Sequence, residues 1–94
     1  AVCVGVSVYQ RGFLRLGVCA WDAQRFAEVL RLVCGFDQVI LIPNEEATLR
    51  RIELTLRKEV IEKTRPGDTV LLFWSGHGGR VMATATEVKF DYLV

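Results

Sequence analysis

The sequence predicts an α/β fold in which two strand–helix–strand units build a mainly parallel sheet and a hairpin follows. Two observations predict it. Apolar runs of strand length alternate with longer stretches in which apolar residues recur every three or four positions. Glycine, proline or polar clusters separate these stretches. Strands that alternate with helices in this way join a parallel sheet through right-handed crossovers.

The first strand is predicted over Ala1–Tyr9, where valine recurs at every second position. After a glycine-containing loop, Asp22 is expected to cap a helix that continues to about Cys34. Gly35 suits the position just after that helix. Residues three and four apart give the helix one apolar face. This face comprises Ala23, Phe26, Ala27, Leu30, Val33 and Cys34.

The second strand is predicted over Phe36–Pro43, where proline ends an apolar run. Thr48 is expected to cap a second helix that reaches Thr64, and the Pro-Gly pair that follows stops this helix. Apolar residues at helical spacing give the second helix a buried stripe. This stripe comprises Leu49, Ile52, Leu56 and Val60.

The third strand is predicted over Asp68–Trp74, and its β-branched and aromatic content predicts burial on both faces. The strand is followed by the loop Ser75–Gly79, which carries His77, the only histidine of the sequence. Two short strands, Val81–Thr84 and Val88–Val94, are then expected to form the hairpin.

Composition and charge limit the classes of function. The chain has 94 residues, of which 51% are hydrophobic, and a net charge of +1. We expect one domain at most, and because both ends fall inside predicted strands we expect a part of a larger domain. The sequence has no basic block interleaved with aromatic residues and no apolar run of about 20 residues. We therefore expect neither a nucleic acid nor a membrane as partner.

The three cysteines, Cys3, Cys19 and Cys34, are widely spaced and form no CxxC pair. They fit neither a disulfide framework nor a zinc site, so a reducing, cytoplasmic compartment is expected. Cys3 and Cys34 are interpreted as apolar packing residues. Cys19 is expected in the loop after the first strand, on the same sheet edge as His77.

His77 is the main candidate for chemistry. It follows the carboxyl end of a predicted strand, where open α/β sheets place their ligands. Three of its four flanking positions are glycine, which lets backbone N–H groups approach a ligand. An imidazole there is suited to proton transfer, but it could equally be a loop histidine that caps a carbonyl group. A single histidine without clustered ligands does not make a zinc site, and no phosphate-binding glycine motif is present.

The run Asp68–Gly78 resembles the histidine strand of the caspase-like cysteine peptidases, especially the metacaspase branch. The resemblance covers nearly the whole chain. Its other segments are Val4-Gly5-Val6, Asp22-Ala23 with Leu30, Gly35-Phe36 with Val39, Asn44–Thr48 with Ile52, Pro66-Gly67-Asp68 and Tyr92-Leu93-Val94. The resemblance implies a three-layer α/β/α caspase-like fold, of which residues 1–94 would be the N-terminal βαβαβ part and the hairpin.

The same resemblance implies a cysteine endopeptidase that cleaves proteins or peptides with a Cys–His dyad. His77 matches the dyad histidine, and the backbone N–H of Gly78 would help to hold the oxyanion. In the family the nucleophilic cysteine lies on a later parallel strand, so it is expected beyond Val94, in the remaining C-terminal part of the domain. No cofactor is evident. Metacaspases can be activated by calcium, but no residues of a calcium site are identifiable in the sequence.

Cys19, Asp22 and Ser75 resemble the metacaspase S1 pocket, whose acidic lining selects arginine or lysine before the scissile bond. Asp22 could instead serve only as the helix cap. Trp21 departs from the small polar residue that is common in the family, and it would narrow the pocket or stack on the substrate side chain. Arg15 lies near the position of the arginine with which caspases select aspartate, and it would reverse the specificity if it pointed into the pocket.

Two functions of other classes remain open. A catalytically dead caspase-like signalling or interaction module would keep this fold without a nucleophile. A flavodoxin-like binding module would share the same order of strands and helices.

Overall fold

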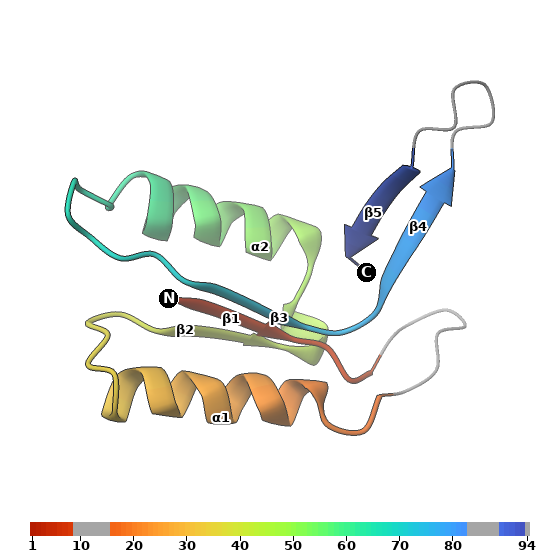
Figure 1. Cartoon of the computed structure of the whole chain (residues 1–94), viewed down its shortest axis with the longest axis horizontal. Coiled ribbons are helices and arrows are strands. Elements are labelled where there is room, and N and C mark those ends of the chain that lie inside the picture. Colours follow the sequence, from red (N-terminus) through yellow and green to blue (C-terminus); the bar gives the residue numbers. More distant parts are fainter. Residues whose placement is uncertain (9–15, 83–88, 94) are drawn as a thin grey trace.

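β1 lies at the centre of a three-stranded parallel sheet (Figure 1). The computed structural model describes residues 1–8, 16–82 and 89–93. β1 (Val2–Gly5) pairs in parallel with β2 (Ile40–Pro43) on one side and with β3 (Leu72–Ser75) on the other. β4 (Gly78–Met82) and β5 (Lys89–Leu93) form an antiparallel hairpin. The predicted α/β fold, with its parallel sheet and hairpin, is confirmed.

Helices cover both faces of the sheet and give the molecule three layers (Figure 1). α1 (Cys19–Leu32) packs on one face. α2 (Leu49–Thr55) lies over the other face and continues into η2 (Leu56–Ile61), a π-helical segment. η1 (Asn44–Glu46), a single 3₁₀ turn, joins β2 to α2.

The core consists of two apolar clusters, one on each face, because successive residues of β1 point to opposite sides of the sheet. The cluster under α1 comprises Cys3, Ala23, Ala27 and Leu30. The cluster under α2 comprises Val2, Val4, Val6 and Ile42, with Ile52, Leu56 and Val60 packed against it. β1 is therefore buried on both faces.

α1 begins earlier than predicted and is capped from outside its own sequence. It starts at Cys19, and its N-cap residue Val18 makes no side-chain capping bond. Instead, the hydroxyl oxygen of Ser7 caps the helix by accepting a hydrogen bond from the Ala20 N–H at 2.8 Å. The prediction that Asp22 caps the helix was wrong. Asp22 lies in the first turn, where its carboxylate interacts favourably with the helix dipole.

The end of α1 departs from the predicted apolar face. Val33 and Cys34 both donate their backbone N–H groups to the Val29 carbonyl, at 2.9 and 3.0 Å, so the regular helix stops at Leu32. Gly35 follows with φ +71, as expected after a helix. This turn leaves Val33 78% exposed and Cys34 exposed. The prediction that these two side chains pack in the core was wrong.

Thr48 caps α2 as predicted, because its side-chain oxygen accepts the Arg51 N–H at 3.1 Å. Leu49, predicted to be buried, is 73% exposed. The backbone of Thr48 is extended, and Ala47 rather than Leu49 packs against the apolar cluster. The helical segment ends at Ile61, before the predicted end.

β3 is less buried than its sequence predicts. Leu71 and Phe73 pack under α1, where the Phe73 ring stacks on Phe26 with 4.6 Å between centroids. On the opposite face Val70 and Leu72 are 52% and 53% exposed. Within the described sheet β3 is an edge strand, and the α2 cluster is centred on β1 and β2. The prediction that this strand is buried on both faces was therefore wrong for the described residues.

Candidate active site

The carboxyl ends of the three parallel strands meet at one edge of the sheet, which we call the carboxyl edge. Gly5 of β1 is in register with Pro43 of β2 and with Ser75 of β3. The Val6 N–H donates to the Ser75 carbonyl at 2.9 Å and extends the β1–β3 pairing to the end of the strand. His77 follows two residues later, half-buried, just before β4 begins. The structure thus places His77 at the carboxyl edge.

The first turn of α1 lies against the same edge. A β-carbon on Gly5 would lie 2.5 Å from the Cys19 carbonyl oxygen and 2.6 Å from the Ala23 Cβ. Only a glycine allows the helix to approach the strand so closely. Because Gly5 is paired with Ser75, this contact brings the half-buried Cys19 to the edge that carries Ser75.

Asp22 lies in the same helical turn as Cys19 and is half-buried. Its N–H donates to the Val18 carbonyl at 2.7 Å. The neighbouring Trp21 is 59% exposed, and the Arg25 guanidinium lies 5.4 Å from the centre of its ring. Arg15, on which the opposite specificity would depend, lies outside the described residues.

Two further residues at the carboxyl edge, Ser7 and Asn44, were missed by the sequence analysis. The Oδ1 atom of Asn44 accepts the N–H groups of Ser7 and Val8, at 2.9 and 3.3 Å. The Ser7 side chain in turn accepts the N–H of Ala20. The only sequence signal is a polar residue near the carboxyl end of each of two apolar runs. It does not identify the contacts, because they span 13 and 37 positions.

The three cysteines have different surroundings. Cys3 is buried in β1, and burial raises the pKa of its thiol, so the reactive thiolate is disfavoured there. Cys34 is exposed and lines a cavity at the opposite, amino edge of the sheet. Only Cys19 lies at the carboxyl edge.

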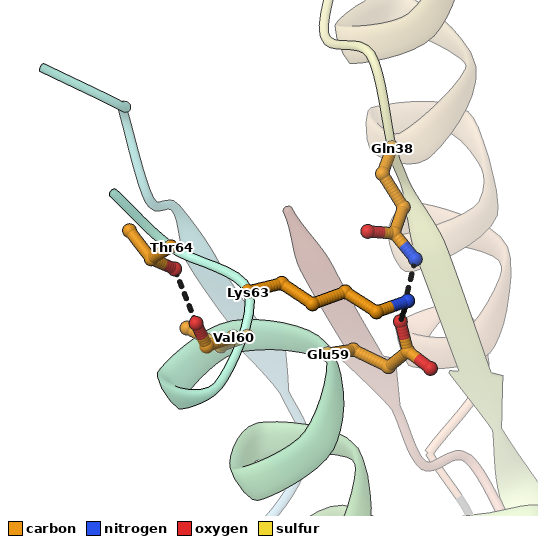
Figure 2. Close-up of polar contacts among 5 residues, drawn as sticks. All are labelled: Gln38, Glu59, Val60, Lys63 and Thr64. Atoms are coloured by element: carbon orange, nitrogen blue, oxygen red, sulfur yellow. Dashed lines mark hydrogen bonds and ion pairs between the residues drawn. The ribbon is translucent and has the colours of Figure 1, made fainter. Parts of the chain in front are cut away.

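The cavity at the amino edge has a volume of about 480 Å³ and is lined in part by Gln38, Glu59 and Lys63. The Glu59 carboxylate accepts hydrogen bonds from the Lys63 ammonium and the Gln38 amide, as Figure 2 shows. These two hydrogen bonds lower the Glu59 pKa, and the one from Lys63 has the larger effect. The Thr64 hydroxyl donates to the Val60 carbonyl beside this cluster (Figure 2). This cavity is separate from the His77 loop.

Neither a metal centre nor a membrane span emerges from the part of the chain that the structure describes. No group of three or more His, Cys, Asp or Glu side chains there could hold a metal ion, so we assign no residue to a calcium site. No described helix is long and apolar enough to cross a membrane.

Comparison with known families agrees with this geometry. The family model of the metacaspase, peptidase C14 domain matches residues 1–94, which is the full sequence. The comparisons with curated proteins and with solved structures found no significant match. A match over the whole chain, on an α/β framework with a histidine at its carboxyl edge, establishes membership. The chain belongs to the metacaspase family of peptidase C14 domains, which are caspase-like cysteine peptidases acting on proteins.

Proposed function

We propose that His77 is the histidine of a Cys–His dyad that cleaves peptide bonds after arginine or lysine. The observation that carries this proposal is the position of His77. It follows β3 at the carboxyl edge, beside Ser75 and across from the first turn of α1, in a chain that belongs to a family of cysteine peptidases.

The chemistry is that of an acyl transfer through sulfur. The cysteine thiolate attacks the scissile carbonyl carbon, and the carbonyl oxygen takes the negative charge, which the Gly78 N–H helps to hold. As the C–N bond breaks, protonated His77 gives its proton to the leaving amine. Water then attacks the thioester and gives a proton to His77, and the thiolate leaves to complete the cycle.

The nucleophile is proposed to come from the remaining C-terminal part of the peptidase domain rather than from Cys3, Cys19 or Cys34. Cys3 is buried among apolar side chains and Cys34 lies at the far edge of the sheet. The exposure of Val70 and Leu72 on β3 supports packing of that remaining part beside this strand. A thiolate enzyme of this kind is proposed to work in a reducing, cytoplasmic compartment.

The specificity pocket is proposed to contain Cys19, Asp22 and Ser75. A carboxylate that is partly withdrawn from water pairs strongly with the cationic end of arginine or lysine. Cys19 and Ser75 would form the adjoining walls, which is consistent with their meeting at the carboxyl edge.

The test uses the full peptidase domain and fluorogenic peptides that end in arginine, lysine or aspartate. His77→Ala should lower kcat by about 10²-fold or more. Cleavage that survives this substitution unchanged would refute the dyad, and cleavage only after aspartate would refute the acidic pocket. Failure of the wild-type domain to cleave any of the three peptides would favour the non-catalytic module.

A second pair of variants tests the origin of the nucleophile. Cys19→Ser should leave kcat close to the wild-type value, with its effect confined to KM. Cys34→Ser, at the opposite edge, is the matched control. Complete loss of cleavage in Cys19→Ser, with full activity in Cys34→Ser, would make Cys19 the nucleophile and overturn the proposed assignment.

A further inference from the structure

We propose that Ser7 and Asn44 are positioning residues for substrate recognition, because their hydrogen bonds hold the first turn of α1, with Cys19 and Asp22, at the carboxyl edge. This inference rests on the proposed function and adds to it two residues that touch neither the substrate nor the reacting atoms.

Ser7 is the junction of this arrangement. It is only 7% exposed, and each of its polar groups has a partner. Its N–H donates to Asn44 Oδ1 at 2.9 Å and its carbonyl accepts the Leu16 N–H at 2.8 Å. Its hydroxyl oxygen accepts the Ala20 N–H, also at 2.8 Å. One buried residue thus joins the end of β1 to the end of β2, to the base of the following loop and to the first turn of α1.

Asn44 meets two requirements at once. Its φ of +45 lies in the left-handed region, which asparagine tolerates better than most residues other than glycine. Its amide oxygen accepts from two successive backbone N–H groups, of Ser7 and Val8. Asn44 is the first residue of η1, and with this left-handed backbone its side chain contacts the chain that follows β1. Glycine would keep the backbone conformation but lose the acceptor, and aspartate would keep an acceptor.

The hydrogen bond from Ala20 reaches the part of α1 on which the proposed pocket depends. Ala20 lies between Cys19 and Asp22 in the chain, and its Cα is 2.9 Å from where a β-carbon on Gly5 would stand. The helix has no side-chain cap from Val18, so the Ser7 hydroxyl supplies a capping bond for the turn. Loss of that bond frees the turn that carries both pocket residues.

Such a loss should act on recognition of the cationic side chain more than on the chemical step. His77 lies beyond β3, which is fixed by its own pairing with β1. A displacement of about 1 Å in a positioning group can cost up to about 10²-fold in rate. The expected signature is therefore a change in discrimination between a charged and a neutral side chain, together with a rise in KM.

The experiment compares variants of the full peptidase domain on two peptides, one ending in arginine and one ending in citrulline, its neutral isostere. Ser7→Ala and Asn44→Gly should each lower the arginine-to-citrulline ratio of kcat/KM by about tenfold. Asn44→Asp should keep the ratio within about threefold of wild type, because it retains an oxygen acceptor. Thr48→Ala is the matched control, since it removes the corresponding capping bond from α2, at the other helix.

Amide hydrogen exchange on the same variants provides a readout that needs no substrate. In Ser7→Ala and Asn44→Gly the amides of residues 19–22 should exchange at least about tenfold faster, while those of residues 26–32 keep their protection. In Thr48→Ala the increase should instead appear at the start of α2.

The two readouts separate the possible failures. Unchanged exchange at residues 19–22 in both variants would refute the claim that Ser7 and Asn44 hold the first turn of α1 in place. The positioning role would be overturned if exchange became faster while the arginine-to-citrulline ratio of kcat/KM stayed unaltered. It would also be overturned if that ratio fell by the same factor in Ser7→Ala and Asn44→Gly as in Thr48→Ala. If the wild-type domain cleaves neither peptide, the proposed function itself fails and the positioning role fails with it. A fall in the arginine-to-citrulline ratio that is confined to Ser7→Ala and Asn44→Gly supports both proposals.

Discussion

Gly5 and Cys19 lie so close together that a β-carbon on Gly5 would stand 2.5 Å from the Cys19 carbonyl oxygen. The contact joins the last residue of the central strand to the first residue of α1. It sets how far the helix stands from the sheet at the candidate active site, so the size of one side chain controls the geometry of that edge.

Gly5→Ala should destabilise the fold and displace the first turn of α1. The added methyl group overlaps backbone atoms that cannot rotate away, and overpacking of this kind costs about 1–3 kcal/mol in the free energy of unfolding. Urea denaturation measures the cost. Gly17→Ala is the control, because a β-carbon there would meet no atom within 4 Å. Equal stability of the two variants would contradict the close contact.

The two faces of β3 should respond differently to truncation. Phe73 stacks on Phe26 under α1, so Phe73→Ala should cost about 2–4 kcal/mol in the free energy of unfolding. Leu72 is 53% exposed on the other face, so Leu72→Ala should cost less than about 1 kcal/mol. Denaturant titration of the two variants checks the difference. Both variants are made in the chain of residues 1–94, where a cost for Leu72→Ala as large as that for Phe73→Ala would contradict the exposure of this face.

The cysteines should react with a thiol reagent in the order of their exposure. Among Cys3, Cys19 and Cys34, the exposed Cys34 should be alkylated before the half-buried Cys19. Cys3 is buried and burial raises the pKa of its thiol, so it should react only when the protein unfolds. Mass spectrometry of timed samples measures the order, and Cys34→Ser identifies the first product. Early labelling of Cys3 in the native protein would be inconsistent with the structure.

Glu59 should contribute to stability in a pH-dependent way. Its pKa is lowered in the folded state, first by the hydrogen bond from Lys63 and then by that from Gln38. A lowered pKa means that the contribution is present above the unfolded-state pKa and is lost as the pH falls through the folded-state pKa. The free energy of unfolding, measured from pH 7 down to pH 3, should therefore fall less steeply with pH in Glu59→Gln than in the wild-type protein. The same substitution at the exposed Glu62 serves as control, and identical pH profiles for both variants would disprove the effect.

Local sequence signals predicted the elements that depend on local interactions. The alternating valines of the first strand predicted β1, and Thr48 was correctly predicted to cap α2 because its acceptor bond reaches only to Arg51. The histidine loop was placed at the carboxyl edge because the order of strands and helices fixes which ends of parallel strands meet.

The errors come from interactions that cross between elements. Asp22 was expected to cap α1, but the capping oxygen belongs to Ser7 on the central strand. Leu72 was expected to be buried because its strand is apolar, but it is exposed. An apolar sequence does not reveal whether a strand lies at an edge of the described sheet. The contact of Asn44 with Ser7 was not predicted because the two residues are 37 positions apart.

The hydrogen bond from the Leu16 N–H to the Ser7 carbonyl joins the two ends of the connection between β1 and α1. A connection closed at its base can change in length without moving its anchors, because each doubling of loop length adds only about 0.6 kcal/mol of closure entropy. Changes in the length of the chain between Ser7 and Leu16 should therefore leave the hydrogen bonds of Ser7 to Asn44, Leu16 and Ala20 in place.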